Sequence, residues 1–288
     1  YASRGLGDVY KRQVSIYPLQ DSGTLLTGYL HPYFEEMPHR KTRPCVVICP
    51  GGAYKYCSDR EADPIAEAYF AKGFQVFVLY YSTTGKEMER PATGFTPLCE
   101  LSASVVHIRE HAEEYGVDPA KIAVCGFSAG GHLAASLGVH WNSEKLRALC
   151  PVEGRQNRPD AMILSYPVIS AQKEVHPEWH DSFSALLGPE RTEEEEAYFS
   201  LENQVDEDTV PAFCWHTMDD DCVCVTNTMR FVKSLYEHGV PAECHLFEHG
   251  HHGLSMCTQE VGDDYPHVAH WFESVSYTHL RAHETRSN

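Results

Sequence analysis

Apolar residues in this chain occur in short, nearly continuous runs, separated by longer segments whose apolar residues recur at helical spacing. Continuous apolar runs are typical of strands in a parallel sheet that has helices on both faces. We therefore predict buried strands at residues 44–50, 75–82, 122–127, 162–168, 212–217 and 243–247.

Two segments between these strands show the helical pattern clearly. Helices are predicted over residues 61–72 and 98–115, and Gly116 provides a C-terminal stop for the second one. Ahead of them, residues 14–19 and 24–34 are expected to form an antiparallel hairpin at one edge of the sheet.

Residues 169–208 interrupt the alternation of strands and helices. This stretch is polar and contains the acidic run 193–196. It predicts a cap-like insertion of loop and helix that overhangs the sheet edge, with the acidic run as a solvated helix face. No repeat or linker divides the remaining chain. The pattern predicts a single α/β domain over residues 14–275, with helices on both faces of a mostly parallel, twisted sheet of about eight strands, in three layers.

The two ends of the chain differ from this pattern. Residues 1–13 and 276–288 show no clear amphipathic periodicity, and both resemble translated sequencing-adapter read-through at the ends of a metagenomic fragment. We expect both ends to be non-native or disordered and the native N-terminus to be missing. Secretion through a lost signal segment therefore stays open.

The net charge limits the kinds of molecule that the protein is expected to bind. At −18 it argues against nucleic acid, whose phosphates need a basic surface, and against anionic membranes. The longest apolar run, residues 74–81, is far too short to cross a bilayer. The expected partner is a small molecule or an oligosaccharide, and the oligomeric state stays open.

Eleven cysteines are scattered over the 288 residues, unlike the dense, even pattern of a secreted disulfide scaffold. Several fall within predicted strands, where a free thiol packs as a small apolar group. Reduced thiols predict a cytoplasmic protein. Cys222 and Cys224 suggest metal ligands, but no second such pair completes a zinc site, so we expect no metal.

The sequence GFSAG at residues 126–130 lies between a predicted strand and a helix-forming run. In this context G-x-S-x-G is typical of a nucleophile elbow, a sharp turn that holds the serine in strained geometry with its hydroxyl exposed. The two glycines remove Cβ atoms that would clash with neighbouring elements. Ser128 is therefore a candidate nucleophile, and the alternative is a serine that only caps the helix.

A serine nucleophile needs a base that takes its proton and an acid that orients the base. Three consecutive aspartates, 219–221, follow the predicted strand at 212–217, and three histidines within 249–252 follow the last strand. Parallel strands bring these segments and the elbow to one edge of the sheet. The pattern predicts a Ser, Asp, His triad but does not choose among the neighbours. The alternative, a metal site, would leave the elbow unexplained.

A glycine-rich turn, PGGAY at residues 50–54, follows the first buried parallel strand. Such a turn can present backbone N–H groups to the oxyanion of a reacting carbonyl. We predict an oxyanion hole formed by the N–H of Gly52 or Ala53 together with that of Ala129. Glu61 is a candidate brace for this turn, or else an acid in the first turn of its helix.

Four segments, GFSAGGHLAASLG, PGGAY, HTMDDDCV and HGHHGLS, resemble the motifs of the acetylesterase group of α/β-hydrolases, the acetyl-xylan esterase-like or feruloyl-esterase-like proteins. The resemblance covers residues 14–275 and implies the α/β-hydrolase fold. It implies Asp220 as the acid, from the family's D-x-x-V-P, and His252 as the base, from H-G-x-H-G. The positions that depart from the family pattern are Ala53 in the oxyanion turn, Cys224 in the acid loop and His251 beside the base, and Asp219, Asp221 and His249 remain competitors.

The resemblance also implies the activity of a serine carboxylic-ester hydrolase. Such an enzyme removes small acyl groups, acetyl above all, from carbohydrate or xylan-derived esters through an acyl-enzyme and without a cofactor. Tyr54 and Trp179 are candidate side chains of the acyl pocket, and His132 is expected to pack under the elbow. Two alternatives stay open: a prolyl-oligopeptidase-like serine peptidase, and a catalytically silent binding protein with the same fold.

Overall fold

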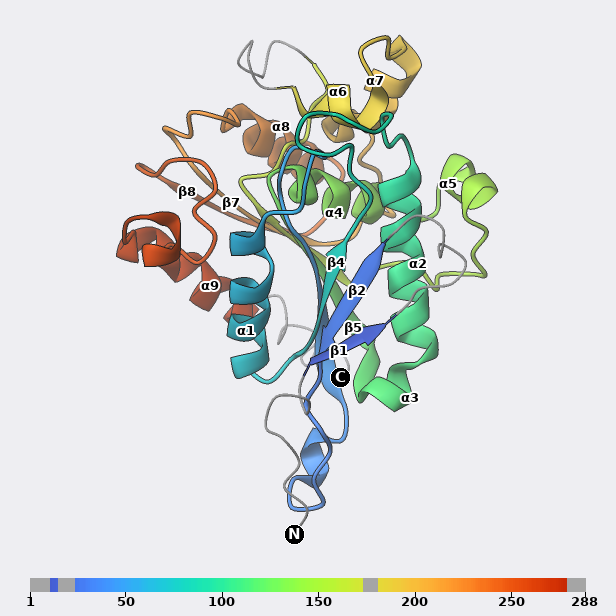
Figure 1. The fold of residues 1–288 in the computed structure, drawn as a ribbon, viewed down its shortest axis with the longest axis vertical. Coiled ribbons are helices and arrows are strands. Elements are labelled where there is room, and N and C mark those ends of the chain that lie inside the picture. Colours follow the sequence, from blue (N-terminus) through green and yellow to red (C-terminus); the bar gives the residue numbers. More distant parts are fainter. Residues whose placement is uncertain (1–10, 15–23, 173–180, 279–288) are drawn as a thin grey trace.

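The computed structural model describes residues 11–14, 24–172 and 181–278, which form an eight-stranded sheet between helices (Figure 1). The order of the strands in the sheet is β1-β2-β4-β3-β5-β6-β7-β8. β1 and β2 are antiparallel to their neighbours and the other strands run parallel, which confirms the predicted mostly parallel α/β sheet. The strands are β1 (Lys11–Val14), β2 (Leu25–Tyr29), β3 (Arg43–Cys49), β4 (Gln75–Tyr80), β5 (Val117–Phe127), β6 (Ala161–Ser165), β7 (Ala212–Thr217) and β8 (Ala242–Phe247).

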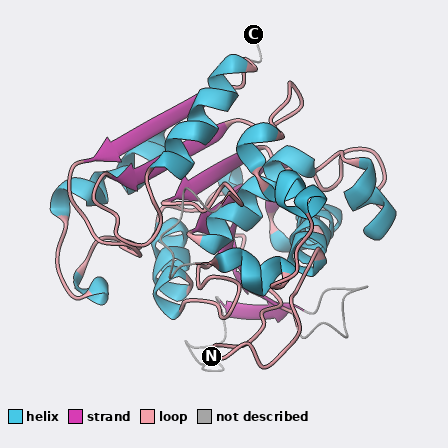
Figure 2. Ribbon diagram, turned by 90° about the horizontal axis from the view of Figure 1, so that it is seen from above, coloured by secondary structure: helices cyan, strands magenta, loops and turns pink. Residues whose placement is uncertain are grey.

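Helices cover both faces of the sheet, in three layers. α1 and α9 pack on one face and α2, α4 and α8 on the other, as Figure 1 shows for α1 and α2. Seen from above, the strands change direction across the sheet, which is its twist (Figure 2). The helices are α1 (Asp63–Ala71), α2 (Thr96–Glu110), α3 (Ala112–Tyr115), α4 (Ala129–His140), α5 (Glu144–Leu149), α6 (Ser182–Leu187), α7 (Glu193–Phe199), α8 (Thr226–Glu237) and α9 (Pro266–Thr278), with short 3₁₀ turns η2 (Pro38–Arg40), η3 (Asp59–Glu61), η5 (Leu201–Asn203) and η6 (Gln259–Val261).

Two apolar cores lie on opposite faces of the central strands. In β4, Phe77 and Leu79 face the core under α2 and α4, whereas Val76 and Val78 face the core under α1 and α9. Side chains alternate between the faces of a strand, so a strand buried on both faces must be apolar at nearly every position. This is why the continuous apolar runs identified these strands correctly.

Helix α4 begins immediately after β5 and is buried along its whole length. Its sequence, AGGHLAASLGVH, is rich in small and apolar residues on every side, as expected of a helix that lies within the protein. Small residues let it approach the sheet closely. The helix that follows the elbow is therefore fixed by the packing around it.

Some strands and helices begin or end at residues other than the predicted ones. β5 begins at Val117, earlier than the predicted 122, because the polar residues before Ile122 extend the strand beyond its buried part. The predicted strand over residues 14–19 lies outside the described residues except for Val14, the last residue of β1. β1 starts at Lys11 and α9 ends at Thr278, so both elements extend past the predicted domain limits.

The described part of the segment 169–208 is less detached than its polar composition suggested. α6 and α7 lie together at the top of the view in Figure 1. Phe183 of α6 and Phe199 of α7 are buried, and the N–H groups of Thr93 and Gly94 donate to carbonyl groups of α6. The acidic run forms the first turn of α7, where carboxylates favour the helix dipole. Within the described ranges, no helix is long and apolar enough to cross a bilayer.

Candidate active site

Ser128 lies on the tight turn between β5 and α4. Its backbone angles, φ 53° and ψ −119°, lie on the positive-φ side that a residue with a side chain rarely adopts. The residue occupies the position before the helix, yet its side chain forms no capping hydrogen bond. The hydroxyl instead faces His252, which favours a nucleophile elbow over a simple helix cap.

The glycines on either side of Ser128 are required by close backbone approaches. A Cβ atom at Gly126 would lie 2.1 Å from the carbonyl oxygen of Gly130, and one at Gly130 would lie 2.0 Å from that of Cys49. Both distances are far below van der Waals contact. The expected reason for these two glycines is therefore confirmed.

His252 connects Ser128 to Asp220. Its Nε2 lies 2.9 Å from the Ser128 hydroxyl oxygen, and its Nδ1 lies 2.8 Å from Oδ2 of Asp220. Because a carboxylate can only accept, Nδ1 carries the hydrogen and donates it, which leaves Nε2 free to accept from the serine hydroxyl. The structure thus brings the three predicted residues together, in contact and in the expected tautomer.

The Asp220 carboxylate is held by four N–H groups. Oδ1 accepts from the backbone N–H of Cys222 and of Val223, at 2.9 and 2.8 Å, and Oδ2 accepts from His252 and from His216, the latter at 3.2 Å. Only 1% of the side chain is exposed. Burial by itself would raise the pKa of this carboxyl, but hydrogen bonds from His216 and His252 outweigh burial and keep the pKa well below its usual value. The group is a fixed anion at neutral pH.

The neighbours that competed for the acid and base positions make other contacts. Asp219 is half exposed and accepts from Nδ1 of His249 at 3.0 Å. Asp221 is exposed. The ring of His251 bonds through Nδ1 to the carbonyl oxygen of His252. The hydrogen bonds that reach the Ser128 hydroxyl therefore run through His252 and Asp220.

His216 was missed by the sequence analysis. It lies near the end of β7, fully buried, and its Nε2 contacts two acceptors, Asp220 and the carbonyl of Val223 at 2.9 Å. Its Nδ1 pairs with the hydroxyl of Thr228 at 2.8 Å. The available signal was a polar residue inside the apolar strand AFCWHT, three residues before the first of the aspartates. Such a residue needs a buried partner.

The glycine-rich turn lies directly against Ser128. A Cβ atom at Gly51 would come within 3.0 Å of the serine Cβ. Gly52 and Ala53 both adopt positive φ, 124° and 55°, so Ala53 accepts a conformation that glycine prefers. In the described part of the chain, the N–H groups of these two residues donate to no protein acceptor. The N–H of Ala129 begins α4, where helices leave N–H groups without an intrahelical partner.

The other predicted site residues lie either in the protein core or in a part of the chain that the structure does not describe. Tyr54 is 1% exposed and its hydroxyl pairs with Nδ1 of His132 at 2.8 Å, so the structure places it in the core and not on an open pocket wall. His132 also donates from Nε2 to the carbonyl of Phe199 at 3.0 Å, as expected for a structural histidine under the elbow. Trp179 lies outside the described residues. Glu61 is buried and accepts from the N–H of Gly51, as a brace of the turn would.

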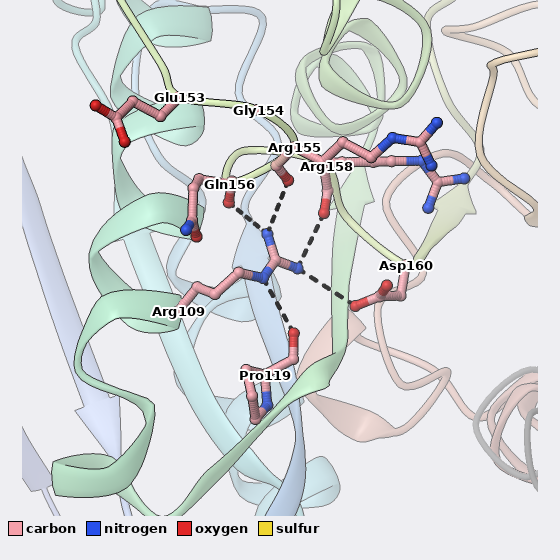
Figure 3. A pocket seen from close by; sticks show the side chains of 8 residues that line it. All are labelled: Arg109, Pro119, Glu153, Gly154, Arg155, Gln156, Arg158 and Asp160. Atoms are coloured by element: carbon pink, nitrogen blue, oxygen red, sulfur yellow. Dashed lines mark hydrogen bonds and ion pairs between the residues drawn. The ribbon is translucent and has the colours of Figure 1, made fainter.

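A cavity of about 630 Å³ lies at the opposite end of the sheet (Figure 3). It is lined at the start of β5 and just before β6 by residues that include Arg109, Pro119 and Asp160. The Arg109 guanidinium spans the cavity wall and donates to four backbone carbonyls and to Asp160. Its donors are used to hold the loop before β6, so Arg109 has a structural role. In the described ranges, no three His, Cys, Asp or Glu side chains are arranged to hold a metal.

A family model described as BD-FAE matches residues 33–235. The chain belongs to the BD-FAE family. The match includes the PGGAY turn, Ser128 and Asp220 but ends before His252, so the place of His252 in the candidate site of this BD-FAE protein rests on the geometry above. The α/β-hydrolase fold and the family resemblance expected from the motifs are both confirmed.

Relatives of this BD-FAE protein include enzymes named for xylan. Endo-1,4-beta-xylanase B of Butyrivibrio fibrisolvens is 39% identical over 220 residues, which are 76% of this chain and 33% of that protein. The acetylxylan esterase of Xylanibacter ruminicola is 26% identical over 227 residues, 77% of this chain and 43% of that protein. The chain therefore spans less than half of either relative.

A solved structure matches nearly the whole chain. The acetyl ester-xyloside bifunctional hydrolase from Caldicellulosiruptor lactoaceticus is 33% identical, with a TM-score of 0.72. The alignment covers 88% of this chain and 89% of that one. The two chains therefore share the fold over almost their full lengths.

Proposed function

We propose that this BD-FAE protein is a serine carboxylic-ester hydrolase with Ser128 as nucleophile, His252 as base and Asp220 as the acid that orients it. The observation that carries the proposal is the 2.9 Å contact between His252 Nε2 and the elbow hydroxyl, with Nδ1 held by a buried anion. A hydroxyl, an imidazole and a carboxylate in this order can transfer a proton as the nucleophile attacks.

In the first half-reaction, Ser128 Oγ attacks the ester carbonyl carbon while His252 Nε2 takes the hydroxyl proton. In this mechanism, the N–H groups of Ala129 and of Gly52 or Ala53 stabilise the oxyanion that forms. The C–O bond to the alcohol then breaks, and His252 returns the proton to the leaving oxygen. The product is an acyl-enzyme ester on Ser128 and a free alcohol.

The second half-reaction uses the same groups. A water molecule gives a proton to His252 Nε2 and attacks the acyl carbonyl through a second oxyanion. The bond to Ser128 Oγ breaks, the serine regains the proton and the carboxylic acid leaves. Asp220 stays ionised throughout and stabilises the imidazolium that forms twice per cycle.

The substrate we propose is an acetyl ester of xylan or of its oligosaccharides. The support is the similarity to an acetylxylan esterase and to an acetyl ester-xyloside hydrolase. An uncharged ester also suits a chain with a net charge of −18, which would repel strongly anionic substrates.

Hydrolysis of p-nitrophenyl acetate, butyrate and octanoate, of acetylated xylo-oligosaccharides and of a prolyl-amide tests the proposal. We expect acetate esters to be preferred, and Ser128→Ala to lower kcat by ~10⁴-fold or more. Ser136→Ala is the matched control, because Ser136 is buried in α4, the helix that follows Ser128, and its hydroxyl donates to the carbonyl of His132 within that helix. Unchanged ester turnover in Ser128→Ala would contradict the serine mechanism. Cleavage of the amide in preference to esters would indicate a peptidase, and no turnover by the folded wild type would indicate a binding protein.

A further inference from the structure

Glu61 is a buried carboxylate with two partners that belong to different parts of the site. Its side chain is almost fully enclosed, with the residue 2% exposed. Oε2 accepts from the N–H of Gly51 at 2.9 Å, and Oε1 accepts from the hydroxyl of Tyr166 at 2.7 Å. In the described chain, no lysine or arginine forms an ion pair with this group. A buried carboxylate without a cation is expensive to keep, so its two hydrogen bonds must offset that cost.

The first partner belongs to the oxyanion turn. Gly51 immediately precedes Gly52 and Ala53, and it lies against Ser128. Its carbonyl oxygen also accepts from the N–H of Ser58, which closes the turn. By holding the Gly51 N–H, Glu61 fixes the plane of the peptide that leads into the two proposed donors.

The second partner belongs to the loop that carries the base. Tyr166 follows β6 and has a positive φ of 37°, which is unusual for a large side chain. Its hydroxyl donates to Glu61 and accepts from the N–H of Ser255 at 2.9 Å, three residues after His252. Its ring meets the His252 ring edge-on, with centroids 5.0 Å apart and planes at 70°. One tyrosine thus contacts both ends of the loop segment that holds the imidazole.

The hydrogen bonds of Ser255 also lead back to the residue next to Glu61. The Ser255 hydroxyl donates to the carbonyl of Arg60, the residue before Glu61, and its own carbonyl accepts from the Trp271 indole of α9 at 3.2 Å. The turn, the carboxylate, the tyrosine and the histidine loop therefore form one closed hydrogen-bonded unit. Polar networks that are fully satisfied in a low-dielectric interior are rigid.

We propose that Glu61 is a positioning residue that sets the oxyanion donors and the His252 loop relative to each other around Ser128, with Tyr166 as its link to the base. This inference rests on the proposed esterase function. Glu61 contacts neither Ser128 nor the reacting ester, so it acts through Gly51 and Tyr166. It predicts a loss of transition-state stabilisation with substrate binding retained.

The central test compares Glu61→Ala with Glu61→Gln and Tyr166→Phe. Glu61→Ala leaves the Gly51 N–H and the Tyr166 O–H unpaired, and we expect kcat to fall by ~10²-fold while KM changes by less than ~3-fold. Glu61→Gln retains one oxygen acceptor and should recover activity to within ~10-fold of wild type. Tyr166→Phe removes the hydroxyl that bonds to both Glu61 and the Ser255 N–H but leaves the Gly51 bond to Glu61 in place, and it should lower kcat by ~10-fold.

A second readout separates positioning from plain stability. An aryl trifluoromethyl ketone adds to the serine and places its oxyanion where the ester's would form. Its inhibition constant should rise across the variants in proportion to the loss of kcat/KM. The matched control is Gln75→Ala, which removes a buried side chain with three hydrogen bonds at the amino end of β4, the edge opposite Ser128. Gln75→Ala should lower the thermal midpoint and leave kcat and the inhibition constant unchanged.

The outcomes distinguish the two proposals. A folded Glu61→Ala protein with kcat within ~3-fold of wild type, alongside an inactive Ser128→Ala, overturns the positioning role and leaves the esterase assignment intact. If Glu61→Ala does not fold, a folded Tyr166→Phe with unchanged kcat and inhibition constant overturns it equally. If Ser128→Ala remains active, the serine mechanism fails and the positioning role fails with it.

Discussion

His216 donates its Nε2–H to Oδ2 of Asp220, the same oxygen that accepts from His252. The two imidazoles share one buried acceptor, and the extra donor restrains the carboxylate from rotating away from the base. His216→Phe keeps an aromatic ring in the core but removes this donor. We expect kcat for p-nitrophenyl acetate to fall by ~10-fold with little change in KM. The control is His140→Gln, which alters a buried imidazole at the far end of α4. Equal kcat values for His216→Phe and wild type would contradict the restraint.

Asp220→Asn tests which aspartate orients the base. An amide can donate to His252 Nδ1, which would put the hydrogen on Nε2 and block acceptance of the serine proton. We expect kcat to fall by ~10⁴-fold for Asp220→Asn and by less than ~3-fold for Asp219→Asn, whose partner His249 is exposed. Steady-state kinetics on both variants measure this. A larger loss in Asp219→Asn would show that the acid is assigned to the wrong residue.

Gly126→Ala tests the close packing of the elbow. The new Cβ would lie 2.1 Å from the carbonyl oxygen of Gly130, and its three nearest atoms are all backbone atoms of Gly130 and Gly131, which cannot rotate away as a side chain could. We expect the free energy of unfolding to fall by more than ~3 kcal/mol in urea titrations. Gly138→Ala in α4, the helix that follows the elbow, is the comparison, because its nearest contact is the flexible Met162 side chain. Gly138→Ala should remain within ~1 kcal/mol of wild type. Similar losses in the two variants would argue against the stated cause.

His140 should make stability depend on pH. Burial lowers the pKa of His140 to about 4, against the opposing effect of its hydrogen bond to the Tyr198 carbonyl. Its contribution to stability is fully present above the unfolded pKa of ~6.5 and is lost as pH falls toward the folded pKa, since only the unfolded chain binds the proton. Between pH 7 and 4.5 this should cost about 2 kcal/mol.

Urea unfolding of wild type and His140→Gln at both pH values measures this loss. The glutamine does not titrate, so the variant should lose about 2 kcal/mol less than wild type over the same range. The exposed His39, replaced by glutamine, serves as the control and should leave the wild-type dependence unchanged. Parallel losses in wild type and His140→Gln would contradict the prediction.

The central sheet was predictable because its strands are buried on both faces. Runs such as residues 75–80 and 212–217 have no polar alternation to confuse them with surface strands. The segment 169–208 was harder, because the glutamates in the first turn of α7 hide the apolar face of that helix in the sequence pattern. Phe183 and Phe199 pack against His132, and Phe199 also packs against Phe95 at the start of α2, all of which are distant in sequence.

The principal site residues were predictable, whereas their supports were not. Ser128, Asp220 and His252 follow strands that end at one edge, so motif order and topology suffice to bring them together. His216 and Tyr166 act through contacts that depend on side-chain direction, which no periodicity shows. Tyr54 illustrates the same limit, because a residue adjacent to the oxyanion turn points into the core to meet His132.

The order of strands has a consequence for how the protein becomes active as it is synthesised. β3 and β4 form the first parallel pair, and β5, β6, β7 and β8 then join the same side of β3 one after another along the chain. The elbow is therefore made early, the aspartate loop follows β7, and the histidine loop arrives only after β8 has paired. If Ser128 depends on His252 as proposed, a nascent chain would carry an inert serine until its last strand is in place. Turnover consequently reports completion of the whole sheet, and an activity assay on stalled ribosomes would time that final step.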